Sequence, residues 1–226
     1  MRHSKSNIPP SNSSWGRQLI DISLAAMGLV VLSPILLLIA SGILWETGFP
    51  ILFSQDRIGR GGQPFRLLKF RTMRADNRGL SVTVSGDSRI TSFGRLLRKF
   101  KLDEVPQLWN VVRAEMALVG PRPEVPEFVD LRQPMWRSVL RVRPGITDPV
   151  SITFRNEEKL LATASNPIRY YRETLLPAKL AMTLAYLQER SLWFDLKVIL
   201  RTLRYVICPN KIRSQETIVF SPGDSK

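Results

Sequence analysis

The longest hydrophobic pattern is a run of 24 uncharged residues from Ile22 to Trp45. A helix of this length is long enough to cross a bilayer. The run is too long for a cleaved signal peptide, and no small-residue cleavage site follows it. The polar residues before it, rich in Pro and Ser, have the composition of a disordered tail. We therefore expect a tail at residues 1–14 and a membrane helix at residues 15–47.

Pro34 lies in the middle of this run and follows Ser33. Because proline removes a backbone hydrogen bond and clashes with the preceding turn, we expect a kink near Ser33, whose hydroxyl could bond the freed backbone. Basic residues, which favour the cytoplasmic side, flank both ends of the run: Arg2, Lys5 and Arg17 before it, and Arg57, Arg60, Arg66, Lys69, Arg71 and Arg74 after it. A re-entrant helix broken at Ser33-Pro34 places both flanks on that side. A plain kinked transmembrane helix is the alternative.

The stretch at 49–75 alternates extended apolar residues around a turn with Gly59, Gly61 and Gly62, which predicts a β-hairpin. These glycines lack the Gly-x-x-x-x-Gly-Lys pattern of a phosphate loop, so a turn is the favoured interpretation. No Asp-x-Asp triplet occurs in the chain. This absence argues against a metal-dependent glycosyltransferase of the usual nucleotide-sugar type.

Two further segments predict basic amphipathic helices. One follows a Thr91 or Ser92 cap, with Ile90, Phe93, Leu97 and Phe100 on one side and Arg95, Arg98, Lys99 and Lys101 around the rest. The other sets an apolar stripe against basic residues: Leu192, Trp193, Leu196, Leu200 and Leu203 against Lys197, Arg201 and Arg204. Such helices can lie on anionic lipid headgroups. A solvated charged face explains the first equally well, and core packing could explain the second. Between them, "PAKLAMTLAYLQER" predicts an ordinary helix.

The stretch "KFKLDEVPQLWNVV" places an acidic pair, Asp103 and Glu104, after a run of positive charge. The spacing of Val105, Leu108, Trp109 and Val112 predicts one buried helix face. Because Pro106 is tolerated only in the first turn, we expect the helix to start near Asp103. Asp103 would then be an N-cap, where the helix dipole favours an anion. The simpler interpretation is an acidic cap followed by a solvated Glu104.

Two prolines flank Arg122 in "MALVGPRPEVPEF", where a short apolar strand ends at Gly120. Pro121 and Pro123 hold this arginine in a stiff loop, so it loses little conformational entropy on binding a planar or phosphate group. A second Arg-Pro-Gly turn occurs at Arg143.

The chain of 226 residues carries 33 Lys and Arg against 19 Asp and Glu, a formal charge of +14. Such a surface favours phosphate in nucleic acid, anionic lipid or a phosphorylated substrate. The single cysteine, Cys208, excludes an internal disulfide framework. The single histidine, His3, lies in the polar tail and makes imidazole chemistry or a histidine metal site improbable.

Several motifs in order resemble the bacterial sugar transferases, the monotopic polyprenol-phosphate phosphoglycosyl transferases. They are the Ser33-Pro34 break, "KFRTM" (69–73), "KLDEVPQLWNVV" (101–112), "LVGPRP" (118–123) and "VRPGIT" (142–147). The resemblance implies a mixed α/β, mostly helical catalytic domain at 48–207 with a re-entrant membrane helix and amphipathic interfacial helices, and leaves a C-terminal tail at 208–226. It implies the small form of the family, without an extra multi-span region.

The resemblance also implies a reaction at the cytoplasmic face of the bacterial inner membrane. A UDP-sugar gives sugar-1-phosphate to undecaprenyl phosphate, with UMP as the second product and Mg²⁺ as the required cofactor. Asp103 would be the nucleophile that forms a covalent phosphosugar, a recognised catalytic strategy, and the pair Asp103 and Glu104 would be the metal-associated carboxylates. Nucleotide or phosphate contacts would come from Arg122 within Pro121 and Pro123, and from Lys69, Arg71, Arg98 and Arg143.

The family pattern is lost after Thr147, where this chain has "DPVSITFRNEEKLL". The sugar therefore cannot be taken from the better-known members of the family, and the pathway and the oligomeric state also stay open. Two other classes compete with this function. A membrane-anchored basic protein that gathers nucleic acid suits the charge, but the chain has no nucleic-acid fold signature, so we expect no nucleic-acid partner. A membrane glycosyltransferase would release UDP instead of UMP.

Overall fold

The computed structural model describes residues 14–74, 86–154 and 156–207. The expected tails at 1–14 and 208–226 lie outside these residues, apart from Ser14. Helices predominate and are accompanied by two sheets of two strands each. The expected mixed, mostly helical α/β class with a long apolar N-terminal helix is therefore confirmed.

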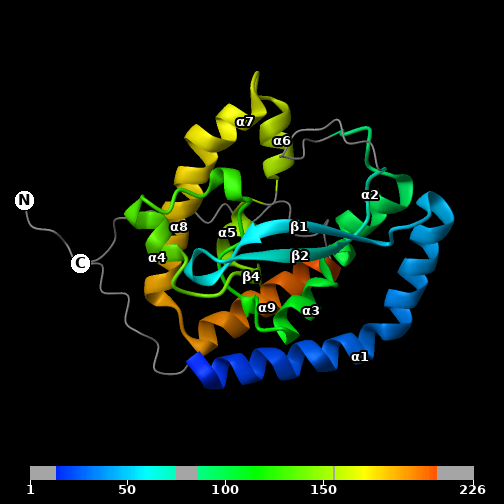
Figure 1. Cartoon of the computed structure of the whole chain (residues 1–226), viewed down its shortest axis with the longest axis horizontal. Helices are drawn as coiled ribbons and strands as arrows, with labels where there is room; N and C mark the ends of the chain where they lie inside the picture. The colour runs from blue at the N-terminus through cyan, green and yellow to red at the C-terminus, as the bar shows by residue number, and fades with distance from the viewer. Residues whose placement is uncertain (1–13, 75–85, 155, 208–226) are drawn as a thin grey trace, which may run out of the picture.

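The helices and strands follow one another in this order (Figure 1): α1 (Ser14–Thr47), β1 (Leu52–Ile58), η1 (Arg60–Gly62), β2 (Pro64–Phe70), α2 (Ser92–Lys99), η2 (Leu102–Glu104), α3 (Gln107–Val112), β3 (Ala117–Val119), η3 (Pro126–Phe128), α4 (Pro134–Val139), β4 (Gly145–Thr147), α5 (Pro149–Thr153), α6 (Glu157–Ala162), α7 (Pro167–Tyr170), the π-helical turn η4 (Tyr171–Leu175), α8 (Leu176–Glu189) and α9 (Leu192–Ile207).

The helix α1 is a single helix of 34 residues with Pro34 inside it. Pro34 cannot donate to the carbonyl of Val30, and the hydroxyl of Ser33 donates to that same oxygen at 2.8 Å. The ribbon of α1 bends strongly between its two ends (Figure 1), as expected for an internal proline. Among the described residues, α1 is the one helix long and apolar enough to cross a membrane, and its most apolar window is only 11% buried.

The predicted hairpin is confirmed. Strands β1 and β2 pair antiparallel with Leu52 opposite Phe70 and Ile58 opposite Pro64. The turn between them uses Gly61 and Gly62 at positive φ, 71° and 79°, where glycine avoids the steric cost of a side chain. The hairpin crosses the middle of the molecule in Figure 1 and carries Lys69 toward the acidic pair.

The second sheet brings two motif segments together. Strands β3 and β4 pair in parallel, with Ala117 beside Gly145 and Val119 beside Thr147. A Cβ at Gly145 would lie 2.5 Å from the oxygen of Gly120, and a Cβ at Gly120 would lie 2.5 Å from the oxygen of Arg143. Only glycine permits this approach, so the loop that follows β3 and the residues that lead into β4 are held backbone against backbone.

Three apolar clusters form the interior. The largest lies among α4, α6, η4 and α8, and includes Trp136, Leu161, Tyr171 and Leu180. The other two lie under α1: one packs Ala25 against Leu67, Val111 and Met116, and the other packs Ile39 and Ile43 against Phe70 and Leu97. In Figure 1, α1 runs along the bottom of the molecule with α3 and α9 close to it. The helices α4 and α8 lie near the left end of the hairpin, and α7 lies above it.

The predicted helices at α2, α8 and α9 are confirmed, and Thr91 caps α2 by accepting from the backbone of Gly94. The predicted buried face of α3 is confirmed only in part. Trp109 is 50% exposed, and Val105, Leu108 and Val112 are only partly buried. The buried residues of α3 are Gln107, Asn110 and Val111. Leu108 and Val112 pack, partly buried, against the cluster of Ala25 under α1, whereas the fully buried side of α3 carries the polar Gln107 and Asn110.

Candidate active site

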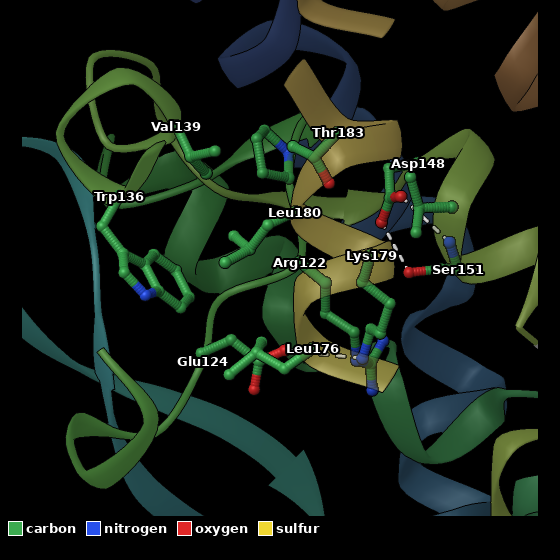
Figure 2. Close-up of a pocket in the computed structure, with 12 residues that line it drawn as sticks. Arg122, Glu124, Trp136, Val139, Asp148, Ser151, Leu176, Lys179, Leu180 and Thr183 are labelled. Carbon is green, nitrogen blue, oxygen red and sulfur yellow. Dashed lines mark hydrogen bonds and ion pairs between the residues drawn. The ribbon is translucent and has the colours of Figure 1, made fainter. Parts of the chain in front are cut away.

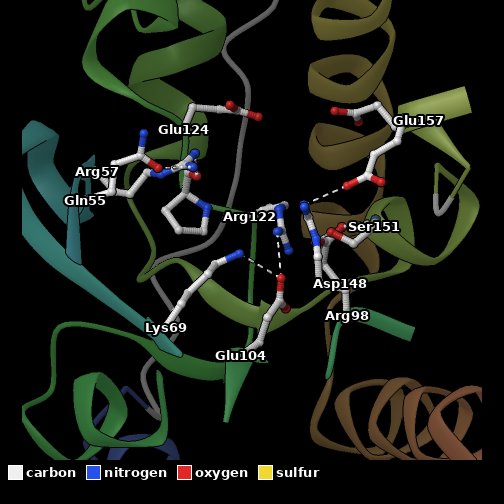
Figure 3. A network of polar contacts seen from close by, with 12 residues as sticks. Gln55, Arg57, Lys69, Arg98, Glu104, Arg122, Glu124, Asp148, Ser151 and Glu157 are labelled. Carbon is white, nitrogen blue, oxygen red and sulfur yellow. Dashed lines mark hydrogen bonds and ion pairs between the residues drawn. The ribbon is translucent and has the colours of Figure 1, made fainter. Parts of the chain in front are cut away.

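Glu104 lies between two cations that come from different parts of the chain. Its Oε1 accepts from Lys69 Nζ at 2.9 Å and from Arg122 Nη2 at 2.9 Å (Figure 3). Lys69 is on β2, and Arg122 is in the loop after β3. Burial opposes ionisation, but the charges of Arg122 and Lys69 prevail and hold the pKa of Glu104 well below its usual range. Glu104 is therefore a permanent anion that fixes both cations.

Asp103 has the opposite environment although it is adjacent in the chain. Its side chain is buried, and its Oδ1 has no hydrogen-bond partner among the described residues. Burial, and next the charge of Glu104, raise the pKa of Asp103, against the weaker effects of Lys69, Lys101 and Arg98. A buried carboxylate oxygen without a partner is costly in free energy. A buried carboxyl group with a perturbed pKa beside a charged partner is a candidate for a functional residue.

The local backbone explains how the two adjacent carboxylates become buried together. Lys101 adopts a left-handed conformation, φ 55°, and reverses the chain after α2. The next three residues form the 3-10 turn η2, closed by the bonds from Glu104 N to Lys101 O and from Val105 N to Leu102 O. The helix α3 begins at Gln107. The predicted N-cap role of Asp103 is therefore wrong, because the tight turn separates Asp103 from the start of that helix.

The arginine between the prolines is held rigidly. Pro121 O accepts from Gly145 N at 2.9 Å, and Pro123 O accepts from the guanidinium of Arg57 at 3.0 Å. Glu104 raises the pKa of Arg122 further above its ordinary value. Arg122 is thus a fixed cation whose backbone is braced on both sides.

Arg98 points toward the same centre from α2 (Figure 3). Its Nη2 donates to Glu158 at 2.8 Å, whereas its Nη1 is buried without a partner among the described residues. Glu158 belongs to α6, inside the segment that departs from the family pattern. One donor of Arg98 is therefore available to an acceptor that enters the site.

The other two predicted phosphate contacts lie in different places. Arg71 donates to the carbonyls of Met73 and Phe49, at 3.1 and 3.0 Å. Arg143 donates to the carbonyl of Ala114 at 2.8 Å and to Gln18 of α1 at 2.7 Å. In this structure both arginines tie segments of the fold together. Neither takes part in the hydrogen bonds around Glu104.

A second polar network, which the sequence did not predict, lies behind Arg122. Lys179 of α8 is buried and contacts Glu157 at 2.9 Å, the Tyr171 hydroxyl at 3.0 Å and Glu124 at 3.5 Å. Figure 2 shows Glu124, Lys179 and Arg122 around a cavity. That cavity holds about 20 Å³, which is room for about one water molecule. It is therefore too small for a nucleotide sugar.

The sequence analysis also missed the polar residues of α3. Gln107 and Asn110 are 2% and 1% exposed. They are three residues apart within α3, a spacing that places both on one side of the helix. That spacing of polar residues is visible in the sequence. It was passed over because the apolar residues between them show the same period.

The acidic pair is the part of the site that could hold a divalent cation. No group of three or more His, Cys, Asp or Glu that could bind a metal occurs among the described residues. Mg²⁺ usually keeps several waters and binds proteins through one or two carboxylates together with substrate phosphates. Two carboxylates, one of them with an unpartnered oxygen, fit that mode of binding.

The arrangement combines a carboxylate nucleophile with converging cations. Lys69, Arg98 and Arg122 can neutralise a polyanion that would otherwise be repelled by the acidic pair. Lys69 and Arg98 are near enough to Asp103 to act on its charge, and one oxygen of Asp103 has no hydrogen-bond partner among the described residues. This combination suits attack by an aspartate on a phosphorus atom.

Comparison with known proteins agrees with this chemistry. The family model for bacterial sugar transferases matches residues 12–209. A UDP-glucose:undecaprenyl-phosphate glucose-1-phosphate transferase of Caulobacter vibrioides is 36% identical over 83% of this chain and 68% of its own length. The exopolysaccharide production protein ExoY of Sinorhizobium fredii is 32% identical over 81% of each chain.

Other relatives are longer than the matched region. A UDP-N-acetylgalactosamine-undecaprenyl-phosphate N-acetylgalactosaminephosphotransferase of Aeromonas hydrophila is 32% identical over 83% of this chain, which spans only 43% of that protein. The residues that the family model matches include α1, the acidic pair, the Arg122 loop and α9. With a family model that matches most of its length, the chain belongs to the bacterial sugar transferases.

Proposed function

We propose that this protein moves sugar-1-phosphate from a UDP-sugar to undecaprenyl phosphate and releases UMP. The product is a polyprenol diphosphate sugar, which suits the first membrane step of glycoconjugate or exopolysaccharide assembly. The names of the relatives support the substrates. The observation that carries the proposal is the contrast within the acidic pair: Glu104 fixes two cations, while Asp103 keeps an unpartnered oxygen beside them.

In the proposed first step, a carboxylate oxygen of Asp103 attacks the phosphorus that carries the sugar. The new bond joins this oxygen to phosphorus, and the bond from that phosphorus to the bridging oxygen breaks, so UMP leaves with the electron pair. In the second step, a phosphate oxygen of undecaprenyl phosphate attacks the same phosphorus and displaces Asp103. The carboxylate is thereby regenerated, and the two-step route predicts ping-pong kinetics.

The basic residues would act on the diphosphate. Arg122 is the proposed nucleotide contact, because its guanidinium has been fixed by Glu104 and by the proline loop. Lys69 and the free donor of Arg98 would bind phosphate oxygens. Arg71 and Arg143 brace the fold in this structure, so any role in substrate binding is secondary to that one.

Asp103 and Glu104 are the residues that would hold Mg²⁺. When bound, the ion would supply positive charge to neutralise the diphosphate. The protein's own part is to hold Glu104 ionised, to keep Asp103 buried and to place three cations around the pair.

We further propose that α1 is re-entrant and that the domain at 48–207 lies on the cytoplasmic face of the bacterial inner membrane. The bend at Pro34 and the basic residues on both flanks support it. The exposed apolar stripe of α9 supports an interfacial position for that helix. Undecaprenyl phosphate would then reach the site from the leaflet that α1 enters.

The reaction is tested by incubating the full-length protein with undecaprenyl phosphate and a panel of UDP-sugars. We expect UMP release with at least one sugar, and we expect a sugar-phosphate adduct on the intact protein when the acceptor is left out. Release of UDP instead of UMP would identify a glycosyltransferase that makes a glycosidic bond. An adduct that persists in Asp103→Asn would remove Asp103 as the nucleophile.

The topology is tested with single cysteines in a chain in which Cys208 is replaced by Ser. We expect a cysteine before α1 and one after it both to resist an impermeant reagent added to intact spheroplasts, and both to react after lysis. Labelling of the N-terminal site from outside would show a spanning helix. Pro34→Ala restores a straight helix and should shift the N-terminal site toward the labelled state.

A further inference from the structure

The segment from Leu102 to Val112 buries a row of mostly polar side chains. Val105 and Pro106, which join η2 to α3, are both in the right-handed helical conformation. The chain between Asp103 and Gln107 therefore stays helical, first as the 3-10 turn η2 and then as α3, and the two residues are about one helical turn apart. The buried residues of η2 and α3 are Asp103, Glu104, Gln107, Asn110 and Val111. All but the last are polar.

Asn110 has a complete structural role at one end of this stripe. Its Oδ1 accepts from Leu68 N at 3.1 Å, and its Nδ2 donates to Arg66 O at 2.8 Å and to Glu115 Oε2 at 2.7 Å. These bonds attach α3 to the backbone of β2. The fold thus explains why an amide is buried at this position.

Gln107 lies between Asn110 and Asp103 and has no comparable role. Its side chain is 2% exposed, and its Nε2 has no hydrogen-bond partner within the described parts of the chain. A buried donor without an acceptor lowers stability and requires an explanation in a native structure. Asp103, one turn earlier, has an acceptor oxygen that is also without a partner. The two side chains are not bonded to each other.

We propose that Gln107 is a further substrate-binding residue, whose Nε2 donates a hydrogen bond to a non-bridging oxygen of the phosphoryl group that reacts with Asp103. This inference rests on the proposed function. A group attached to Asp103 is about one helical turn from Gln107, and both side chains are buried. Non-bridging phosphoryl oxygens are acceptors, so they supply what the amide lacks. A neutral donor also adds a bond without tying up the carboxylate through an ion pair.

The test uses Gln107→Met, which keeps a similar volume and removes the donor. In full-length protein we expect kcat/KM for UMP release to fall about ten- to a hundredfold, the effect of one lost hydrogen bond to a charged group. The midpoint of thermal unfolding without substrate should stay unchanged or rise, because an unpartnered buried amide has been removed. Gln107→Glu, which replaces the donor with an acceptor, should lower kcat/KM at least as much.

Gln133→Met is the matched control, since Gln133 is exposed and far from the pair in sequence; it should change neither quantity. Wild-type kcat/KM in Gln107→Met overturns the inference. So does a joint loss of midpoint and activity, which would make Gln107 a structural residue like Asn110. The wild-type protein is assayed first: if it releases no UMP with any UDP-sugar, the proposed function fails, and that result is distinct from either outcome for Gln107.

Discussion

Two helices that follow each other in the chain differ in the exposure of their apolar side chains: α8 buries them, and α9 leaves most of them exposed. The helix α8 buries Leu176 and Leu180 in the cluster that it shares with α4 and η4, and it also buries Leu187. The helix α9 begins after Arg190 and Ser191 and buries Asp195 and Val198. Its five residues of the predicted apolar stripe are between 43% and 64% exposed: Leu192, Trp193, Leu196, Leu200 and Leu203. The two helices therefore face different surroundings.

The same contrast divides the molecule into two regions. The helical cap, residues 134–189, has the apolar interior of a water-soluble domain. The apolar face, formed by the exposed apolar side chains of α1, α3 and α9, includes Trp15, Leu37, Trp109 and Trp193. Soluble monomers rarely expose so large an apolar surface. The acidic pair lies between the two regions, where a lipid phosphate and a water-soluble nucleotide sugar could meet.

The largest expected effect tests the junction of the two regions. Asp103→Asn retains the shape of the side chain and removes the nucleophile, so UMP release should fall by more than about a thousandfold. Both regions should stay folded, because the side chain of Asp103 holds nothing in place. Steady-state UMP release and circular dichroism of the same preparation check this. A variant with appreciable turnover would leave the pair as a metal site only.

The next prediction concerns the helical cap. Trp136 is fully enclosed in its core, so Trp136→Ala should lower the free energy of unfolding by about 3–5 kcal/mol. Chemical unfolding in detergent measures the change. A loss below about 1 kcal/mol would mean that the cap is not a packed core. The cap would then not differ from the apolar face in the way described.

Arg122→Ala tests the polar boundary between the regions. One charge-assisted hydrogen bond contributes about 1.5–3 kcal/mol, so kcat/KM for the UDP-sugar should fall about ten- to a hundredfold. The pKa of Glu104 should rise, because Arg122 is the strongest of the charges that lower it. Arg132→Ala, which removes an exposed arginine, is the control and should leave kcat/KM unchanged. Unaltered kinetics in Arg122→Ala would remove this residue from the site.

The pH dependence of stability distinguishes the two adjacent acids. Burial raises the pKa of Asp103 above its ordinary value of 3.8, so the folded protein binds this proton more readily than the unfolded chain does. The ionisation of Asp103 therefore lowers the free energy of unfolding as pH rises from 3.8 through the raised pKa. In chelator-treated protein, the stability of Asp103→Asn relative to wild type should increase across that window and then level off. A gap that shrinks with rising pH would contradict the unpartnered environment.

Elements whose patterns depend on local chemistry could be predicted from the sequence. The glycine turn of the hairpin, the Thr91 cap of α2 and the kink at Pro34 each depend on one or two residues. The faces of α3 and α9 could not be assigned by the same logic, because periodicity separates apolar from polar positions without saying which side is inside. In α3 the polar Gln107 and Asn110 are buried more completely than Leu108 and Val112. That outcome depends on Lys69, Arg122 and β2, which are distant in sequence.

The site shows the same division between local motif and tertiary contact. The acidic pair, Arg122 and Lys69 were identified from motifs, and the structure brings all of them together. Arg71 and Arg143 belong to similar motifs, but their guanidinium groups bond distant backbone carbonyls instead. Gln107 was missed. It lies among periodic apolar residues, and the sequence does not show that its amide donor will be buried without a partner.

The smallest expected effect on stability comes from the matched change on the apolar face. Trp193 is 64% exposed and contacts Lys197, whose ammonium lies 5.6 Å from the ring. Trp193→Ala should alter the free energy of unfolding in detergent by less than about 0.5 kcal/mol, as for other exposed positions. In nanodiscs, the difference between the wild-type and Trp193→Ala emission spectra isolates the fluorescence of Trp193. That emission should be blue-shifted and quenched by brominated lipid, because an interfacial helix buries its aromatic end among acyl chains. Lost fluorescence that is red-shifted and insensitive to brominated lipid would mean that α9 faces water, and its exposed leucines would then have to be covered by another protein surface.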